Sequence, residues 1–353
     1  MSYSQIPKPE GSFTEGLCSA LQVNLNDIAG SNAPALRREK VGYVDALMSD
    51  ANRAGFSAQI VPTNGKIRGV QIKYQNQICD NVVSTDCTPT CTPDFEPTPN
   101  EQLITSFDCL RVRMSFDEME MRKLCEADSV WVGQTIMNAM NGLNVKLDKV
   151  LLAGVGDSYY TSDSGTCTDD NLNVPLFNSN GQANPMAWAY IKHIYEQTGA
   201  NGIPFLIGGG SIDLFAKATQ MACCNTNYGM DLSNWMNDAY YYYDRFLNSI
   251  GSSTSTIMLA PGTRQLILWN KYVGDYAKRN DSFEHGTVVD PFTGLVYDLK
   301  TNYDDCAEKW FVELGLNYHH WAIPGGACNC PDYTGVTWIN DCSAGAAISC
   351  PES

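Results

Sequence analysis

The stretch SFDEMEMRKLCEADSVWVGQTIMNAMNG, residues 115–142, decides the fold predicted for this chain. It opens with a capping box, because the Ser115 hydroxyl can accept a backbone N–H one turn later while Glu118 reaches back to the Ser115 amide. Apolar residues then recur at helical spacing until Gly142, a residue typical of helix ends. We therefore predict one helix of about 26 residues, roughly 39 Å long. Such a helix is about twice the usual length and is typical of a spine on which sheets pack.

The residues before this helix predict an arm followed by a long hairpin excursion. Residues 1–35 are polar and rich in Pro, Gly and Asn, which indicates an extended arm, and residues 34–52 carry a rough amphipathic helical pattern. Strand-like residues flank the turn sequence PTNG at 62–65, whose Asn-Gly pair is a strong hairpin signal. A turn-rich insert at 79–100 leads into another predicted strand at 104–114.

The second half of the chain alternates between strand and helix signals. Residues 145–155 fit a strand or a short helix, and residues 185–198 predict a second amphipathic helix that begins at a proline. A buried strand at 204–207 enters three glycines and then a further helix. Later elements are predicted at 257–262 (strand and turn), 265–269 (helix or strand), 295–299 and 310–318 (two strands, expected to be antiparallel neighbours).

The composition is that of a globular protein and excludes several functions. The 353 residues are 44% hydrophobic and carry a net charge of −16, from 39 acidic and 23 basic side chains. An acidic chain with no basic patch is not expected to read nucleic-acid sequence. The first residues lack the basic and apolar regions of a signal peptide, and no apolar run is long enough to span a bilayer. We therefore expect a protein made in the cytoplasm, with no membrane contact.

Fourteen cysteines are unexpected in a protein made in a reducing compartment. A protein that folds inside the cell and works outside it would reconcile the two observations. We expect disulfides or staples in two peripheral excursions, with the candidates Cys79, Cys87, Cys91, Cys328, Cys330, Cys342 and Cys350. A zinc site built from His319, His320 and nearby cysteines is the weaker interpretation, because Cys-x-Cys is a poor spacing for structural zinc.

A dense aromatic run indicates either a core edge or a subunit interface, since Tyr and Trp are enriched at interfaces and a monomer rarely exposes such patches. The candidate interface residues are Trp235, Tyr240, Tyr241, Tyr242 and Tyr243, together with Asn64 and Gly65 at the predicted hairpin turn.

Signals for enzymatic chemistry are weak. The three glycines at 208–210 lack the third glycine of a dinucleotide fingerprint and the Lys-Ser/Thr ending of a P-loop, so a tight strand-to-helix turn is favoured. Ser211 lacks a nucleophile elbow, and four histidines offer few bases for a Ser-His-Asp site. We expect no catalytic residue, no cofactor and no metal.

The order of arm, long hairpin, capped spine helix and later strand–helix domain resembles the major capsid proteins of tailed bacteriophages, which share the Hong Kong ninety-seven fold. The residues that carry the resemblance are the hairpin at 62–65, the spine at 115–142 with its sequel LDKVLLAG at 147–154, and the strand–turn sequences FLIGG at 205–209 and IMLAPGTR at 257–264. The likeness is architectural and covers nearly the whole chain. It implies an α+β fold with a long spine helix, an extended β-hairpin loop, and peripheral and axial domains.

The resemblance also implies a division of the chain. The implied parts are an N-terminal arm (1–50), an extended loop with a Cys-rich insert (55–112), a peripheral domain with the spine helix (113–182 and 293–325), an axial domain (183–292) and a Cys-rich C-terminal tail (326–353).

The function implied by the resemblance is a major capsid protein that self-assembles as pentamers and hexamers into an icosahedral shell around a phage genome. Its partners would be copies of itself, portal, scaffold or minor capsid proteins, and non-specifically packaged DNA, and its location the virion. Two other classes stay open, namely another virion component such as a tail or decoration protein, and a disulfide-stabilised extracellular binding module. A hydrolase would need a pocket uniting Ser211 or Asp213 with a histidine.

Overall fold

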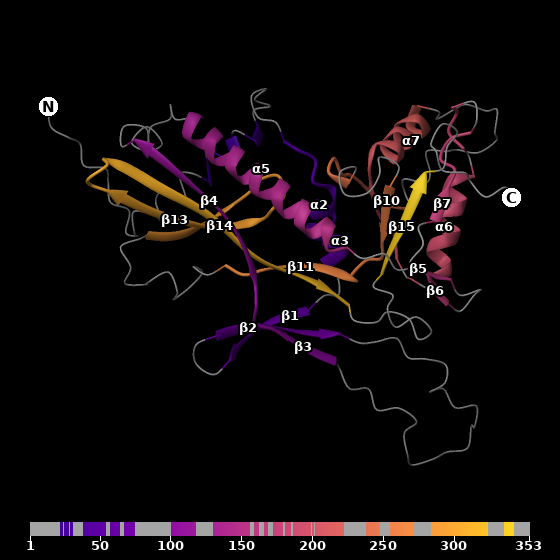
Figure 1. The fold of residues 1–353 in the computed structure, drawn as a ribbon, viewed down its shortest axis with the longest axis horizontal. Helices are drawn as coiled ribbons and strands as arrows, with labels where there is room; N and C mark the ends of the chain where they lie inside the picture. The colour runs from indigo at the N-terminus through magenta and orange to yellow at the C-terminus, as the bar shows by residue number, and fades with distance from the viewer. Residues whose placement is uncertain are drawn as a thin grey trace, which may run out of the picture. The chain divides into compact units, whose positions relative to one another are not determined.

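The structure is a computed structural model, shown in Figure 1. It describes residues 22–23, 25–27, 29–30, 38–53, 57–63, 67–74, 100–117, 130–155, 159–161, 166–168, 172–178, 181–184, 186–198, 200, 202–221, 238–247, 255–270, 284–323 and 335–341. The chain divides into two compact units. Unit 1 comprises Met1–Glu39, Phe107–Leu147 and Leu266–His319, and unit 2 comprises Lys40–Ser106, Asp148–Gln265 and His320–Ser353.

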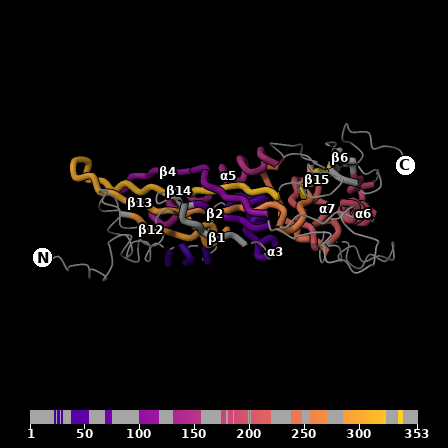
Figure 2. The backbone as a smooth tube through the Cα atoms, turned by 90° about the horizontal axis from the view of Figure 1, so that it is seen from below, coloured from indigo at the N-terminus to yellow at the C-terminus, as the bar shows by residue number. Residues whose placement is uncertain are grey.

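Unit 1 is built on an antiparallel sheet whose central strand is β14 (Lys309–Ala322). Strand β14 pairs with both β4 (Asp108–Asp117) and β13 (Val296–Asp304) over residues 309–315, so these two strands flank it. Strand β12 (Glu284–Val289) follows β13, and β11 (Arg264–Leu268) also pairs with β14. Figure 2 shows β4, β14 and β13 running alongside one another. The predicted antiparallel pairing of 295–299 with 310–318 is confirmed.

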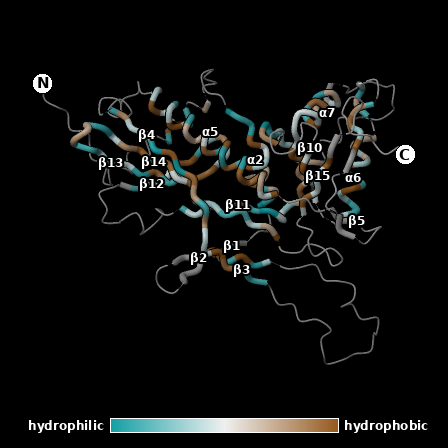
Figure 3. Tube along the Cα trace, in the orientation of Figure 1, coloured by the Kyte–Doolittle hydropathy of each residue, from teal (hydrophilic) through white to brown (hydrophobic). Residues whose placement is uncertain are grey.

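Helix α5 (Val130–Ala153) is the long magenta helix of Figure 1. Its 24 residues span about 36 Å at 1.5 Å per residue. Side chains of its buried stripe recur every three or four residues, at Val132, Ile136, Met140, Leu143, Leu147 and Leu151. In Figure 3 the tube of α5 changes between hydrophobic and hydrophilic colours along its length, as expected for an amphipathic helix.

Polar side chains fix α5 to the sheet of unit 1. The buried Asn144 amide donates to Asp290 Oδ2 at 2.7 Å, and the hydroxyl of Tyr297 on β13 donates to Asn144 Oδ1. The Thr293 hydroxyl donates to the same Asp290 oxygen at 2.7 Å. At the other end of the contact, the rings of Phe116 and Trp131 meet edge to face, with centroids 6.0 Å apart. Helix and sheet are therefore joined by polar as well as apolar contacts.

The predicted limits of the spine helix are wrong. Residues 115–117 belong to strand β4, so the Ser115 capping box starts no helix there, and Glu118 lies outside the described residues. At the other end, α5 runs past Gly142 to Ala153, so residues 145–153 of the segment predicted as strand or short helix are helical. The reason at the first boundary is pairing, because Asp108–Asp117 joins β14 along its whole length.

Unit 2 contains a five-stranded sheet in the order β7-β15-β10-β8-β9. The bounds are β7 Leu172–Val174, β15 Val336–Asp341, β10 Ser255–Leu259, β8 Phe205–Gly208 and β9 Tyr240–Tyr243. Helices α6 (Ala187–Gln197) and α7 (Gly210–Met221) share one hydrophobic core with this sheet. That core includes Leu176, Ile191, Leu206, Ile212, Phe215 and Met258. The helix predicted at 185–198 and the strand predicted at 204–207 are confirmed.

The three glycines after β8 make a strand-to-helix turn, as predicted. Strand β8 ends at Gly208 and α7 begins at Gly210. A Cβ atom on Gly208 would lie 1.7 Å from Cγ2 of Ile212, so a side chain there would collide with the first turn of α7. Glycine is therefore needed at 208 for close packing of the helix on its own strand.

The predicted hairpin forms a three-stranded antiparallel sheet of β1 (Ser57–Thr63), β2 (Ile67–Tyr74) and β3 (Asn100–Ile104). The register pairs Thr63 with Ile67, which confirms the antiparallel pairing of the strands on either side of the predicted turn; residues 64–66 themselves lie outside the described residues. Trp321 of β14 holds this sheet, because its indole N–H donates to Gln102 Oε1 at 2.8 Å and its ring packs on Tyr74. The strand expected at 104–114 is instead two strands, β3 and β4.

The remaining elements are short. They are α2 (Gly42–Met48), α3 (Asp50–Arg53), β5 (Tyr159–Thr161) and β6 (Thr166–Thr168). Helices α2 and α3 confirm the later part of the helix predicted at 34–52. Within the predicted extended arm, the described residues 22–23, 25–27 and 29–30 are helical, so an extended conformation is wrong for them. Among the described residues, none of the helices is both long and apolar enough to cross a bilayer.

Candidate subunit interface

The tyrosine run Tyr240–Tyr243 is strand β9, at one edge of the five-stranded sheet of unit 2. It pairs in parallel with β8, with Phe205 opposite Tyr240 and Gly208 opposite Tyr243. No other strand pairs with β9 in the part of the chain that the structure describes. An edge strand presents backbone N–H and C=O groups that a further strand can bind.

The tyrosine side chains alternate between the two faces of the sheet. The rings of Tyr240 and Tyr242 stack on Phe205, at centroid distances of 5.1 and 6.1 Å. Tyr241 faces the other way and packs against the core below α6 and α7. Tyr240 remains 40% exposed, whereas the other three tyrosines are half-buried. The run is therefore an amphipathic edge and not part of the interior.

Two charged residues of α7 hold the Tyr241 face in place. The Tyr241 hydroxyl donates to Asp213 Oδ1 at 3.4 Å, and Lys217, one turn later, contacts the second Asp213 oxygen at 2.5 Å. Burial, followed by the negative charge of Asp213, raises the pKa of Tyr241 well above its usual value. Tyr241 is thus a neutral hydrogen-bond donor at all physiological pH values.

Helix α2 packs against β8 and β9 and depends on a glycine to do so. A Cβ atom on Gly42 would lie 2.8 Å from both the carbonyl carbon and the carbonyl oxygen of Tyr243. Backbone atoms at the end of a paired strand cannot move aside easily. The first residue of α2 must therefore be glycine for the helix to reach the tyrosine strand.

Two buried carboxyl groups bind the first turn of α2. Asp244, directly after β9, accepts the Tyr43 N–H at Oδ2 (2.9 Å), while its Oδ1 accepts the N–H groups of Phe246 (2.8 Å) and Leu247 (3.1 Å). Asp148 of α5 accepts the Val44 N–H at Oδ1 (3.2 Å), whereas its buried Oδ2 accepts no hydrogen bond. Neither aspartate is exposed.

The two carboxyl groups share one proton. Burial, followed by the charge of Asp244, raises the pKa of Asp148 to about 9. Asp244 is the partner that keeps its negative charge, because it accepts three backbone N–H groups and Asp148 accepts only one. Asp148 is thus protonated at neutral pH and can donate that proton to Asp244.

A third polar contact joins α3 to the turn after β10. The buried Asn52 donates to the Arg264 carbonyl at 2.9 Å and accepts the Gly262 N–H at 2.9 Å, while its own carbonyl accepts the Gln265 amide at 2.6 Å. Sequence reasoning missed Asn52, Asp148 and Asp244. The one available signal was Asp148, a charged residue on the apolar stripe of a helix.

Most other candidate residues lie outside the described residues. These are Trp235, Asn64, Gly65 and all seven candidate cysteines, Cys79, Cys87, Cys91, Cys328, Cys330, Cys342 and Cys350. Two described cysteines, Cys109 and Cys306, are exposed free thiols.

The histidines proposed for zinc have packing roles in the structure. His319 meets the ring of Phe107 edge to face, and His320 forms a hydrogen bond with the Tyr43 hydroxyl at 3.0 Å. The described residues hold no group of three or more His, Cys, Asp or Glu side chains that could bind a metal ion.

No protein-family model and no curated protein matches this sequence. Solved structures of phage proteins, however, match the fold over most of the chain. A chain of the cyanophage A-1(L) capsid asymmetric unit has a TM-score of 0.52 and 12% identity, covering 88% of this chain and 94% of that chain. Chains from Mycobacterium phage Adephagia (TM-score 0.44, 8% identity, 91% and 94% covered) and Mycobacterium phage Cain (0.43, 10%, 90% and 94%) are also similar.

The likeness to the cyanophage chain shows the fold. It extends along most of both chains, so the shared feature is the fold, with its long helix and antiparallel sheets. The predicted α+β, Hong Kong ninety-seven-like fold is thereby confirmed. At 12% identity the likeness rests on architecture and not on individual side chains.

Proposed function

We propose that this chain is the major capsid protein of a tailed-phage-like particle and assembles into an icosahedral shell around the genome. The observation that carries the proposal is the end-to-end likeness in fold to a chain of a cyanophage capsid. The role is structural, and the protein would reside in the virion. Its main partner is itself, as pentamers and hexamers, with portal, scaffold and minor capsid proteins as further partners.

The negative net charge of the chain is consistent with a shell that does not bind the packaged DNA tightly. A net charge of −16 disfavours tight binding to packaged DNA, so contact with the genome would be non-specific. A capsid subunit also needs many modest contacts that close into rings. Edge strands and exposed hairpins provide such contacts, and both are present in the described residues.

We propose β9 as one of the contacts between subunits. Its outer edge offers backbone groups to a strand of a neighbouring copy, and Tyr240 offers an exposed aromatic ring already supported by Phe205. Because Asp213 orders Tyr241 on the opposite face, little side-chain freedom would be lost on binding. The predicted interface role of Trp235, Asn64 and Gly65 is kept as part of this proposal.

The predicted division into domains and the predicted disulfides are part of the proposed function. Residues 113–182 with 293–325 would form the peripheral domain and residues 183–292 the axial domain, preceded by the arm (1–50) and the extended loop (55–112) and followed by the Cys-rich tail (326–353). The candidate cysteines would stay reduced during assembly in the cell and form disulfides in the released particle. A non-reducing gel of particles before and after exposure to air would test this.

The function is tested by expressing the chain alone and measuring its mass by analytical ultracentrifugation, with and without reductant. We expect pentamers, hexamers or closed shells. A monomer under both conditions would contradict autonomous assembly and favour an extracellular binding module. Open tubes or trimers would instead favour a tail or decoration protein.

A further inference from the structure

Strand β12 ends the antiparallel sheet of unit 1, because β13 is the one strand that pairs with it in the part of the chain that the structure describes. At its last residue, however, the outer edge of β12 is occupied. The N–H of Val289 donates to Gln22 Oε1 at 2.8 Å, and the Gln22 side-chain amide donates to the Val289 carbonyl at 3.0 Å. One side chain thus binds both backbone groups of Val289, as a residue on a neighbouring antiparallel strand would.

The backbone groups that Gln22 binds point away from β13. In an antiparallel pair, residues that bond to the partner strand alternate with residues whose N–H and C=O face outward. The next residue, Asp290, bonds inward, because its N–H donates at 2.9 Å to the carbonyl of Leu295, directly before β13. Val289 is therefore a position at which a further strand would add, and the Gln22 amide takes the place of that strand.

The Gln22 amide is held in position by its own segment. Its nitrogen also donates to Asn26 Oδ1, four residues later, at 3.2 Å, so both amide hydrogens are used. Leu25, on the same segment, is fully buried. The described helical residues 22–23, 25–27 and 29–30 are therefore anchored by an apolar contact as well as by the bonds to Val289.

The turn that follows β12 is ordered and offers a second anchor. The buried Asp290 carboxylate accepts the Phe292 N–H at 3.0 Å and the Asn144 amide of α5 at 2.7 Å. The guanidinium of Arg38 lies over the Phe292 ring, 5.1 Å from its centroid. Gln22 and Arg38 thus bind neighbouring parts of the same ordered edge.

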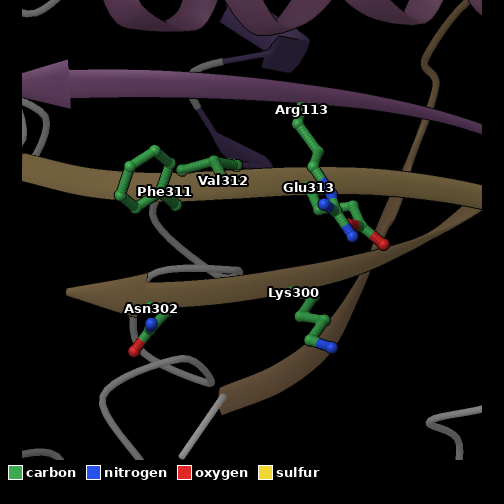
Figure 4. Close-up of a pocket in the computed structure, with 6 residues that line it drawn as sticks. All are labelled: Arg113, Lys300, Asn302, Phe311, Val312 and Glu313. Atoms are coloured by element: carbon green, nitrogen blue, oxygen red, sulfur yellow. The ribbon is translucent and has the colours of Figure 1, made fainter. Parts of the chain in front are cut away.

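The sequence of β12 gives it little protection of its own. Edge strands are commonly protected by charged side chains or by proline. Elsewhere on this sheet, Arg113 of β4 forms an ion pair with Glu313 of β14, and Lys300 lies on β13 beside them (Figure 4). After Glu284, by contrast, β12 reads HGTVV, with no acidic residue, Lys, Arg or Pro. Its last residue, Val289, is apolar and 38% exposed. Two copies of this strand would therefore meet without repulsion between charges.

We propose that the Gln22 side chain is a clip that closes the β12 edge and prevents β12 of a second copy from pairing with it. An antiparallel pair of two β12 strands centred on Thr287 would place Val289 of one copy opposite residue 285 of the other. The backbone groups of Val289 cannot bond to that residue and to Gln22 at once, so the two arrangements exclude each other. The inference goes beyond the proposed function and does not rest on it, because the clip acts within one subunit.

Amide hydrogen exchange of the full-length chain, resolved to single residues, tests the clip. Gln22→Met keeps the length of the side chain but removes the amide, and we expect the Val289 N–H to exchange at least about tenfold faster. The Asp290 N–H should exchange as in the wild type, which shows that the sheet stays folded. The matched control is Asp27→Asn, an exposed position on the same segment, which should leave Val289 unchanged. Equal exchange of Val289 in Q22M and the wild type would overturn the clip.

Disulfide trapping tests the protective role. In Q22M/T287C, two β12 strands paired around residue 287 would bring the new thiols within disulfide range, since Cα atoms of paired residues lie about 5.5 Å apart. After treatment with diamide, mass spectrometry should detect at least about tenfold more peptide linked through position 287 of both copies than in T287C alone. Identifying that peptide separates it from cross-links through the exposed native Cys109 and Cys306.

The two measurements do not depend on shell formation. If Q22M frees the Val289 N–H but Q22M/T287C yields no more of the linked peptide than T287C, the protective role is wrong. A wild-type chain that stays monomeric would contradict the proposed function, whereas the clip would still stand or fall by the exchange of Val289.

Discussion

Asp148 and Asp244 lie side by side in the interior of unit 2, and both carboxyl groups accept a backbone N–H from the first turn of α2. Asp148 belongs to α5 and Asp244 follows β9, so the pair joins three segments that are distant in sequence. Two buried negative charges in contact would repel each other strongly. The pair is therefore stable only while it holds one proton.

The carboxyl pair predicts that subunit stability falls as the pH rises. The pKa of Asp148 is raised from 3.8 to about 9, so the folded subunit binds one proton more than the unfolded chain between these values. The free energy of unfolding of isolated subunits should therefore decrease from pH 5 to pH 9. Asp45 and Tyr43 also interact electrostatically with Asp148, and the charge of Arg264 acts on Tyr43; these groups modulate the slope without reversing it.

The variant Asp148→Asn isolates this effect, because its amide can donate permanently to Asp244. We expect a flatter pH profile than in the wild type and, at pH 9, greater stability by on the order of a few kcal/mol. Urea denaturation at pH 5, 7 and 9 measures both. Asp305→Asn, in the exposed hairpin tip, should leave the wild-type slope unchanged. Equal slopes for D148N and the wild type would refute the shared proton.

Two glycine variants should have opposite effects on stability. Gly42→Ala places a Cβ atom 2.8 Å from the Tyr243 backbone and should destabilise the subunit by about 1–3 kcal/mol. Gly142 lies in the middle of α5 on its exposed face, and a Cβ atom added there would have no atom within 4 Å. Alanine there should stabilise by up to about 1 kcal/mol. Thermal unfolding of both variants decides the matter, and a destabilised G142A would argue against a continuous α5.

Substitutions that remove the polar contacts between α5 and the sheet should destabilise the subunit. Tyr297→Phe removes the hydroxyl that donates to the buried Asn144, and we expect a loss of about 1–2 kcal/mol. Asn144→Ala also removes a donor to Asp290 and should cost more. Tyr190→Phe, on the exposed face of α6, serves as the control with no expected loss. If the urea concentration at the midpoint of unfolding is the same for Y297F and the wild type, the Tyr297 hydroxyl does not contribute to stability.

The tyrosine strand should affect assembly more than folding. Tyr240→Ser removes an exposed ring at the edge of the sheet, and we expect the concentration needed for assembly to rise severalfold. Tyr190→Ser removes a ring of similar exposure, 46% against 40%, from α6, away from the edge strand. It should assemble normally. Light scattering follows assembly, and circular dichroism checks that both variants fold. Unchanged assembly of Y240S would remove β9 from the interface.

The boundary between β4 and α5 shows why local signals misled the prediction. Leu110, Val112, Met114 and Phe116 alternate with polar residues, which is the period of a strand, while Ser115 to Glu118 fits a capping box. Both patterns are locally valid. The ten-residue pairing with β14, about 200 positions later, decides in favour of the strand. A prediction from local sequence cannot identify this partner strand, because it lies so far along the chain.

The spine helix itself was predictable because its stripe is long. A glycine inside a helix costs only about 1 kcal/mol, and burial of Leu143, Leu147 and Leu151 beyond Gly142 outweighs that cost. The tyrosine run was also recognised, since its composition alone is unusual. The polar residues Asn52, Asp148 and Asp244 were missed because their partners are brought together only by the fold.

The most direct test of the central claim is electron microscopy of the purified chain expressed alone. The proposed function predicts rings with five or six subunits, or closed shells with icosahedral symmetry. Uniform single subunits, seen with and without reductant, would contradict it.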